Sequence, residues 1–351
     1  MTFESIVQSI PVWLNDEGPE SSIVISSRTR LARNIAGYWY THRADKDKLG
    51  EIVNEVLEAA DIAGFNQDDF FRNSDLDDIK KNIFIERHLI SPALAAATGN
   101  RGVLVKDNES CSIMVNEEDH LRIQCMKAGF DPMAALEEIA DIEKKLACSL
   151  SFSYSRDYGY LTACPTNFGT GFRVSVLIHL PALVLTKEIQ RVIRSAGQLG
   201  MVVRGYRGEG SDVVGNMFQI SNQSSFGKTE YDIVQSLMTA VRQIIEYEMN
   251  TAEMLMKEAK HQIEDKIWRS IGILKTARVL STHEFINLCS AVRLGIHLRI
   301  LDTPDIKILN ELMILIQPGH LQERIGRQLE PVERDVIRAD LIRERFIDVK
   351  M

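Results

Sequence analysis

The residue pattern of the chain changes once, near residue 243, and this change limits the architectures open to it. Before it, apolar and alternating runs typical of strands are mixed with helical patterns. After it, strand patterns disappear and helical patterns continue, as in residues 254–256, 308–316 and 335–346. We therefore expect an α+β domain built on an antiparallel sheet, followed by an all-helical domain of about 100 residues.

The clearest strand pattern covers residues 173–180, where polar and apolar side chains alternate. Arg173, Ser175 and His179 fall on one face, as in a half-buried strand that carries a polar site. The opposite, apolar face consists of Val174, Val176, Ile178 and Leu180. Further strands are predicted at residues 24–25, 113–115 and 121–125, and helices at 48–60 and 132–146.

Composition excludes some classes of function. The 351 residues carry a net charge of −8, whereas nucleic-acid-binding proteins are usually basic. The sequence has no apolar run of the roughly 20 residues that a membrane helix needs, and residues 1–4 do not resemble a signal peptide. The five cysteines form no CxxC pair, which favours free thiols in a reducing compartment. We expect a cytoplasmic protein that binds neither nucleic acid nor membrane.

Several arginines stand in polar or glycine-rich turns or just after short apolar runs: Arg28, Arg30, Arg122, Arg173, Arg204 and Arg207. On an extended backbone, Arg28 and Arg30 would point the same way. A guanidinium stays charged and binds phosphate oxygens in a bidentate manner, so the set suits a triphosphate. For any one of these arginines alone, a surface ion pair is the simpler interpretation.

Four segments, residues 26–34, 116–122, 164–173 and 204–209, resemble the phosphagen kinases, the superfamily of creatine kinase and arginine kinase. They occur in the family's order and span most of residues 23–250. The resemblance implies a glutamine synthetase-like catalytic domain at residues 23–252. An N-terminal segment, residues 1–22, would precede it, and a helical domain, residues 253–351, would follow.

The resemblance also implies a site for ATP with Mg²⁺, the metal being held by phosphates and water rather than by protein ligands. His88 would lie near the nucleotide, although it could instead be a structural histidine. The residues assigned to ATP in this way are Ser26, Ser27, Arg28, Thr29, Arg30, His88, Arg122, Arg173, Val174, Ser175, Val176, Leu177, Arg204, Gly205, Tyr206, Arg207, Gly208 and Glu209.

The acceptor of such a kinase is a guanidinium, which must lose a proton before its nitrogen attacks phosphorus. Carboxylates can hold it, orient one nitrogen and accept that proton. By the resemblance, Glu118 and Glu209 form this clamp, and one of them is the base. Cys164 matches the family's reactive cysteine. The alternatives are a solvated turn residue at Glu118, a loop residue at Glu209 and a neutral thiol at Cys164.

The segments before and after these motifs bear on which guanidinium is used. Kinases of free guanidino compounds resemble one another in having a helical domain before the first motif, which here begins at residue 26. Residues 88–92, 220–223 and 308–315 resemble the McsB family of protein arginine kinases instead. We therefore expect phosphorylation of arginine side chains in proteins. The family's role implies marking for Clp-type proteolysis and control of stress repressors.

Residues 334–339 match that family's RDxxRA motif, described as an allosteric phosphoarginine pocket; they are Arg334, Asp335, Val336, Ile337, Arg338 and Ala339. Arg334 and Arg338 share one helix face and could hold a phosphate, while Asp335 could meet a guanidinium. The alternative is a solvated charged helix face. The resemblance further implies a homodimer or larger assembly, a zinc-containing McsA-like activator protein and a Clp ATPase as partners.

Two other functions remain open from the sequence. One is a kinase of free guanidino compounds, and the other is a phosphoarginine-binding adaptor with weak kinase activity. The retained carboxylates and phosphate-binding arginines argue against the adaptor. The pair Tyr206 and Arg207 departs from the McsB pattern. An arginine at the position of Arg207 resembles the sequence of arginine kinases that act on small substrates.

Overall fold

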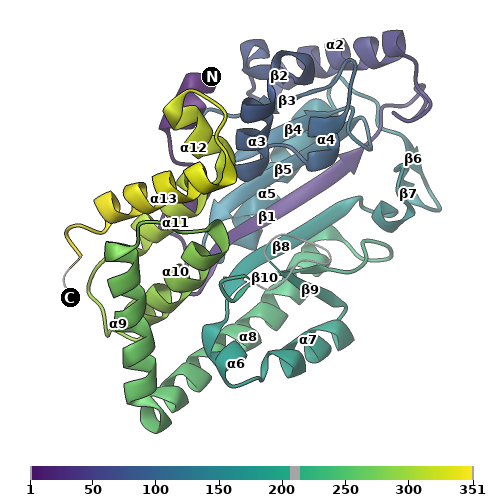
Figure 1. The fold of residues 1–351 in the computed structure, drawn as a ribbon. Coiled ribbons are helices and arrows are strands. Elements are labelled where there is room, and N and C mark those ends of the chain that lie inside the picture. The colour runs from purple at the N-terminus through teal and green to yellow at the C-terminus, as the bar shows by residue number, and fades with distance from the viewer. Residues whose placement is uncertain (1, 206–213, 350–351) are drawn as a thin grey trace.

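The computed structural model describes residues 2–205 and 214–349. Within these ranges, an antiparallel eight-stranded sheet has the order β2-β3-β4-β5-β1-β8-β10-β9 (Figure 1). The strands are β1 (Val24–Arg33), β2 (Phe70–Arg72), β3 (Gly102–Val105), β4 (Cys111–Val115), β5 (Leu121–Ala128), β8 (Phe172–His179), β9 (Met201–Gly205) and β10 (Met217–Asn222). A separate hairpin pairs β6 (Tyr154–Ser155) with β7 (Gly159–Tyr160). The predicted α+β class and antiparallel sheet are confirmed.

One face of the sheet packs against α2 (Lys46–Ile62), α5 (Pro132–Leu146), α7 (Ile189–Gln198) and α8 (Glu230–Glu258), and the short α6 (Pro181–Leu185) follows β8. Local signals explain where these helices begin. Asp131 caps α5 by accepting from the Ala134 amide at 3.2 Å, and Pro132 follows at the first position. Thr229 caps α8 in the same way. This packing forms the main hydrophobic core.

The other face, called the open face below, is covered only at its ends. Near β3 and β4 it packs against α1 (Phe3–Gln8), α3 (Asp78–Glu86) and α4 (Pro92–Ala96). Elsewhere it packs against Trp13 and Leu14 of η1 (Val12–Leu14), which adjoin α11 (Ile306–Leu315). The remaining 3-10 turns are η2 (Gln67–Asp69), η3 (Asn73–Asp75) and η4 (Pro165–Asn167). The centre of this face is left to polar side chains.

In the described part of the chain, no strand follows β10, as the sequence predicts. The helices of this region are α9 (Lys260–Thr276), α10 (Thr282–His297), α11 (Ile306–Leu315), α12 (Pro318–Ile325) and α13 (Pro331–Arg345). They enclose a second hydrophobic core. A domain division after residue 252 lies inside α8, so it would cut a continuous helix. Among the described residues, no helix is long and apolar enough to cross a membrane.

The register of the central strands places several arginines side by side on one face of the sheet. Arg28 lies opposite Ser175, and Arg30 lies opposite Arg173. On the other side of β1, Arg30 pairs with Gln124, two residues beyond Arg122 on β5. Cross-strand partners share a face, so all these side chains belong to the open face.

We predict that Ile123→Ala lowers the free energy of unfolding by about 2–5 kcal/mol, because the side chain is completely buried on the helix-covered face of β5. Urea denaturation measures the change. Ile62→Ala removes the same atoms from a side chain that is 53% exposed, and it should cost far less. Equal losses in the two variants would contradict the assignment of the faces.

Candidate active site

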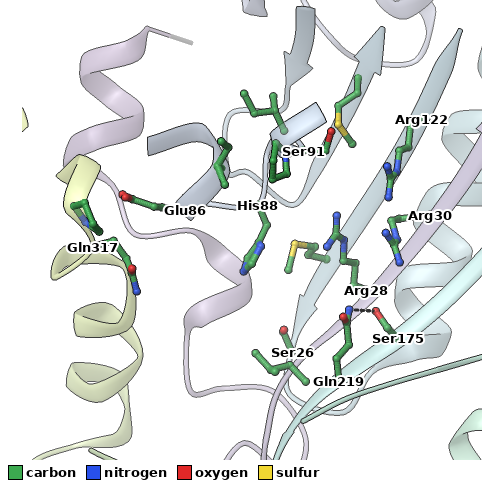
Figure 2. Close-up of a pocket in the computed structure, with 17 residues that line it drawn as sticks. Ser26, Arg28, Arg30, Glu86, His88, Ser91, Arg122, Ser175, Gln219 and Gln317 are labelled. Atoms are coloured by element: carbon green, nitrogen blue, oxygen red, sulfur yellow. Dashed lines mark hydrogen bonds between the residues drawn. The ribbon is translucent and has the colours of Figure 1, made fainter. Parts of the chain in front are cut away.

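A cavity of about 530 Å³ opens on the centre of the open face and is called the larger cavity. Arg28, Arg30 and Arg122 form one wall (Figure 2). The opposite wall contains Glu86 of α3 together with Gln317 and Pro318 at the start of α12. The remaining lining residues are Ser26, Ile85, His88, Ile90, Ser91, Pro92, Met114, Met126, Ser175, Leu177 and Gln219.

Arg28 and Arg30 of β1 lie beside one another and are partly buried. Burial and the neighbouring Arg122 charge lower the pKa of Arg28 to about 9. The pKa of Arg30 is also lowered, first by burial and then by the Arg28 charge. Among the described residues, Nε of Arg28 and Nε of Arg30 find no hydrogen-bond acceptor. Partly buried positive charges with unused donors suit a polyanionic ligand.

His88 contributes a neutral ring to this cavity. It follows α3 in the left-handed conformation, with φ of 59°, and its ring lies 5.5 Å from that of Trp13. Its backbone oxygen accepts from Gln124, and the Gln124 side chain in turn accepts from Arg28. Burial and the charges of Arg28 and Arg30 lower the pKa of His88 to about 3. The ring therefore adds no positive charge to the arginine cluster.

A second cavity of about 140 Å³, called the smaller cavity, adjoins the first and shares Arg30 and Arg122 with it. It differs in carrying carboxylates and a thiol. The other lining residues are Leu31, Ala32, Glu117, Glu118, Asp119, Cys164, Thr166, Asn167, Gly171 and Arg173. Cys164 is partly exposed, and its Sγ lies 3.0 Å from Oγ1 of Thr166.

The turn between β4 and β5 fixes the position of Glu118. The Asp119 carboxylate accepts from the Asn34 amide and from the Ala163 backbone, both at 2.6 Å. The Thr41 hydroxyl donates to the Glu118 carbonyl oxygen at 2.6 Å. His120 accepts from the Ile35 amide at 3.0 Å, so the next residue of the turn is fixed as well. Polar side chains thus hold the backbone on both sides of Glu118.

The two glutamates of this turn have different environments. Glu117 accepts from Arg122 at 2.9 and 3.0 Å, and this charge keeps its pKa below the usual value although burial opposes the effect. The pKa of Glu118 is raised, first by burial and then by the charges of Asp119 and Glu117. Glu117 therefore orients an arginine, whereas Glu118 has the higher proton affinity that a base needs.

The predicted run of ATP-binding residues is corrected at four positions. Ser27 and Thr29 point toward α5, where the Thr29 hydroxyl donates to the Ala135 carbonyl oxygen at 2.9 Å. Val174 and Val176 are completely buried in the main core. Successive side chains of a strand point to opposite faces. Of the residues predicted to bind ATP on these two strands, Ser26, Arg28 and Arg30 on β1 and Arg173, Ser175 and Leu177 on β8 line the two cavities.

The last predicted segment is described only in part. Arg204 pairs with Gln219, which lines the larger cavity, so Arg204 lies on the same face. Gly205 ends β9 opposite Phe218. Tyr206, Arg207, Gly208 and Glu209 lie outside the described residues.

Residues 334–339 lie on α13, and their contacts differ from the predicted arrangement. Arg338 is almost completely buried, and it donates to the carbonyl oxygens of Ile316 at 3.0 Å and Leu280 at 2.8 Å. Asp335 accepts from Arg338 at 2.5 Å, so this carboxylate already holds a guanidinium of the same chain. Arg334 is half-buried and donates to the Leu329 carbonyl oxygen. Ala339 is buried, Ile337 partly buried and Val336 exposed.

Sequence reasoning missed several lining residues. Glu117 could have been found, because it adjoins Glu118 in the same turn. Glu86 and Gln219 carried no distinguishing local signal. Gln317 and Pro318 enter the larger cavity from the helical region, which no local pattern could indicate.

Comparison with known families agrees with this geometry. Residues 48–251 match the ATP:guanido phosphotransferase C-terminal catalytic domain, and residues 260–351 match the protein-arginine kinase McsB C-terminal domain. The crystal structure of lombricine kinase is similar, with a TM-score of 0.58 and 25% identity over 69% of this chain and 71% of that one. A duplicated taurocyamine kinase from Schistosoma mansoni shares the fold, with a TM-score of 0.59 and 21% identity over 81% and 43% of the two chains. The fold and the site define an ATP:guanido phosphotransferase.

Curated relatives narrow this class. A protein-arginine kinase from Halothermothrix orenii is 44% identical over 97% of this chain and 98% of its own length. One from Bacillus subtilis is 43% identical over 99% and 96%, and one from Geobacillus stearothermophilus is 46% identical over 96% and 94%. The chain belongs to the protein-arginine kinase family.

We predict that the His88 imidazole stays neutral between about pH 5 and about pH 8, because its pKa of about 3 lies below this interval. Ring ¹⁵N chemical shifts measure this, with the resonance assigned by its loss in His88→Gln. A histidine-containing peptide in the same buffers serves as the titrating reference. A protonation step of His88 within that interval would show that the ring is not held beside charged arginines.

Proposed function

We propose that the protein transfers the γ-phosphate of ATP to arginine side chains of proteins. One observation carries the proposal: a cavity lined by partly buried arginines and a cavity lined by carboxylates meet at Arg30 and Arg122. The first suits a triphosphate and the second a guanidinium. Phosphoryl transfer needs mainly such positioning and charge stabilisation.

ATP would lie in the larger cavity with its phosphates against Arg28, Arg30 and Arg122. Arg173 and Arg204 would complete this set from the neighbouring strands, and Mg²⁺ would add charge neutralisation. Among the described residues, Glu86 is the one carboxylate that lines this cavity, and it accepts from α12. The metal would therefore be held by phosphates and water, as Mg²⁺ often is.

The acceptor guanidinium would lie in the smaller cavity, held by Glu118 and also, by the family resemblance, by Glu209. A carboxylate takes one proton from the guanidinium, and the freed nitrogen attacks the γ-phosphorus. A nitrogen–phosphorus bond forms while the bond to the β–γ bridging oxygen breaks, so ADP leaves with that electron pair. Cys164 as a thiolate would add a negative charge beside the guanidinium.

The names of the relatives support proteins rather than free arginine as acceptors, because the match covers nearly their whole lengths. We place the protein in the cytoplasm and retain the division into residues 1–22, 23–252 and 253–351. Exposed apolar residues of the helical region support a surface for dimerisation or for an activator and a Clp ATPase; they include Val279, Ile325, Val332 and Ile347.

We predict that the purified protein, given Mg-ATP and an unfolded arginine-rich protein, forms acid-labile phosphoarginine, and that Glu118→Gln lowers kcat by about 10²–10⁴-fold. The amide cannot accept the guanidinium proton. Mass spectrometry under neutral conditions maps the phosphate. Glu209→Gln tests the second carboxylate of the clamp.

Glu51→Gln is the matched control, because Glu51 lies on α2 and pairs only with Lys48 and Tyr38 among the described residues. Free arginine is included as a competing acceptor. Phosphate on free arginine alone would reject the proposal and show a kinase of free guanidino compounds instead. If neither acceptor is phosphorylated, even with cell extract added as a source of activator, the proposed kinase function is rejected in favour of the phosphoarginine-binding adaptor.

We predict that free phosphoarginine raises the initial rate of the wild-type kinase and that Arg334→Ala abolishes this rise. Arg334 is chosen because Arg338 is committed to backbone oxygens, so replacing Arg338 would also disturb the fold. Arg324→Ala removes an exposed arginine of α12 and should leave the rise intact. Equal stimulation of wild type and Arg334→Ala would reject residues 334–339 as the pocket.

A further inference from the structure

Part of the wall of the larger cavity opposite the arginines comes from the helical domain. Gln317 and Pro318 precede and begin α12, and Figure 2 shows Gln317 beside Glu86, across the cavity from Arg30. Figure 1 shows α12 next to α3. The shape of the cavity therefore depends on how α12 sits against α3.

A single carboxylate joins these two helices. Glu86, the last residue of α3, accepts from the Gly319 amide at 2.7 Å and from the His320 amide at 3.2 Å. The first amides of a helix lack partners within the helix, and a negative charge there also matches the helix dipole. Glu86 thus caps α12 from the other domain.

His320 strengthens this joint. Its Nε2 lies 3.3 Å from Nη1 of Arg87, and its Nδ1 lies 2.7 Å from the Glu86 carboxylate. Because a guanidinium only donates, Nε2 must accept, and Nδ1 therefore carries the proton that it donates to Glu86. Arg87 is itself buried and paired with Glu109. The joint is thus a connected and largely buried polar network.

Gly319 permits the close approach of the two helices. A Cβ atom at this position would lie 2.8 Å from the Glu86 carboxylate and 2.9 Å from the backbone nitrogen of Ile83. Any larger residue would push α12 away from α3. The joint can thus be altered from α3 by replacing Glu86 and from α12 by replacing Gly319.

The joint is connected to the arginines on one side and to α13 on the other. His88 stands two residues after Glu86, and its backbone oxygen is tied through Gln124 to Arg28. Arg338 donates to the carbonyl oxygen of Ile316, directly before Gln317. A change in the helical domain can thus reach the nucleotide through a short series of direct contacts.

We propose that Glu86 is a positioning residue for ATP and that the helical domain, through α12, completes the nucleotide site and sets its affinity. The inference rests on the larger cavity being the ATP site, as proposed above. By linkage, the factor by which docking of α12 raises the affinity for ATP is also the factor by which bound ATP favours the docked position of α12.

Two variants test the joint from opposite sides. Glu86→Gln places an NH₂ group against the donors of α12, and Gly319→Ala adds one methyl group while improving helix propensity. Each should raise the Kd and KM for Mg-ATP about tenfold, change kcat less than about twofold and leave the acceptor KM unchanged. The double variant should be little worse than either single one, because both break the same joint.

Glu51→Gln and Gly272→Ala are the matched controls, since Gly272 lies on α9 with open space around its Cβ position. Arg30→Gln serves as the reference for loss of ATP binding. If wild type binds Mg-ATP, Arg30→Gln does not, and both joint variants match wild type, this inference is overturned while the proposed function stands. If wild type does not bind Mg-ATP, or if Arg30→Gln binds it normally, this inference and the proposed function are both overturned. Equal losses in kcat and in acceptor affinity would mark a purely structural role and reject positioning.

Discussion

The rest of the site depends on the partial burial of several arginine charges beside one another on a single face of the sheet. Like charges in a poorly solvated site repel and are costly to desolvate, as the lowered pKa values of Arg28 and Arg30 show. The neighbouring groups limit this cost. His88 is neutral, Gln124 accepts from Arg28, and Glu117 pairs with Arg122. The extensive apolar burial on the opposite face stabilises strands that carry such charges.

The second constraint is that cationic and anionic surfaces meet within one site. Arg30 and Arg122 belong to both cavities, so a phosphate bound in one lies next to a guanidinium bound in the other. Precision at this junction comes from rigid elements. The arginines stand on central strands, and the turn that carries Glu118 is fixed by Asp119 and Thr41. Little rearrangement of the protein is then needed as charge moves during transfer.

The helical domain is more than an appended unit. Its helix α11 contacts η1, where the Asn310 side chain donates to the Leu14 carbonyl oxygen at 2.9 Å. Its helix α10 contacts the sheet, where Oγ of Ser290 lies 2.8 Å from Nε2 of His179 on β8. Through α12 it reaches the site itself. A domain that supplies part of the wall of the larger cavity can influence what binds there without a long series of intermediates, because the contact is direct.

The sequence alone determined the strand that carries Arg173, the helix at residues 132–146, the strand-free C-terminal region and the family, because alternation, capping and motif order are local properties. It predicted Arg28, Arg30 and Glu118 as site residues but could not say which members of a run face the cavity, and Val174 and Val176 proved to be core. Only the tertiary structure decided that Arg30 and Arg122 join two cavities and that Glu86 meets Gly319, more than 200 residues away in the chain. Such pairings follow from the register of strands and the packing of helices, which no local pattern records.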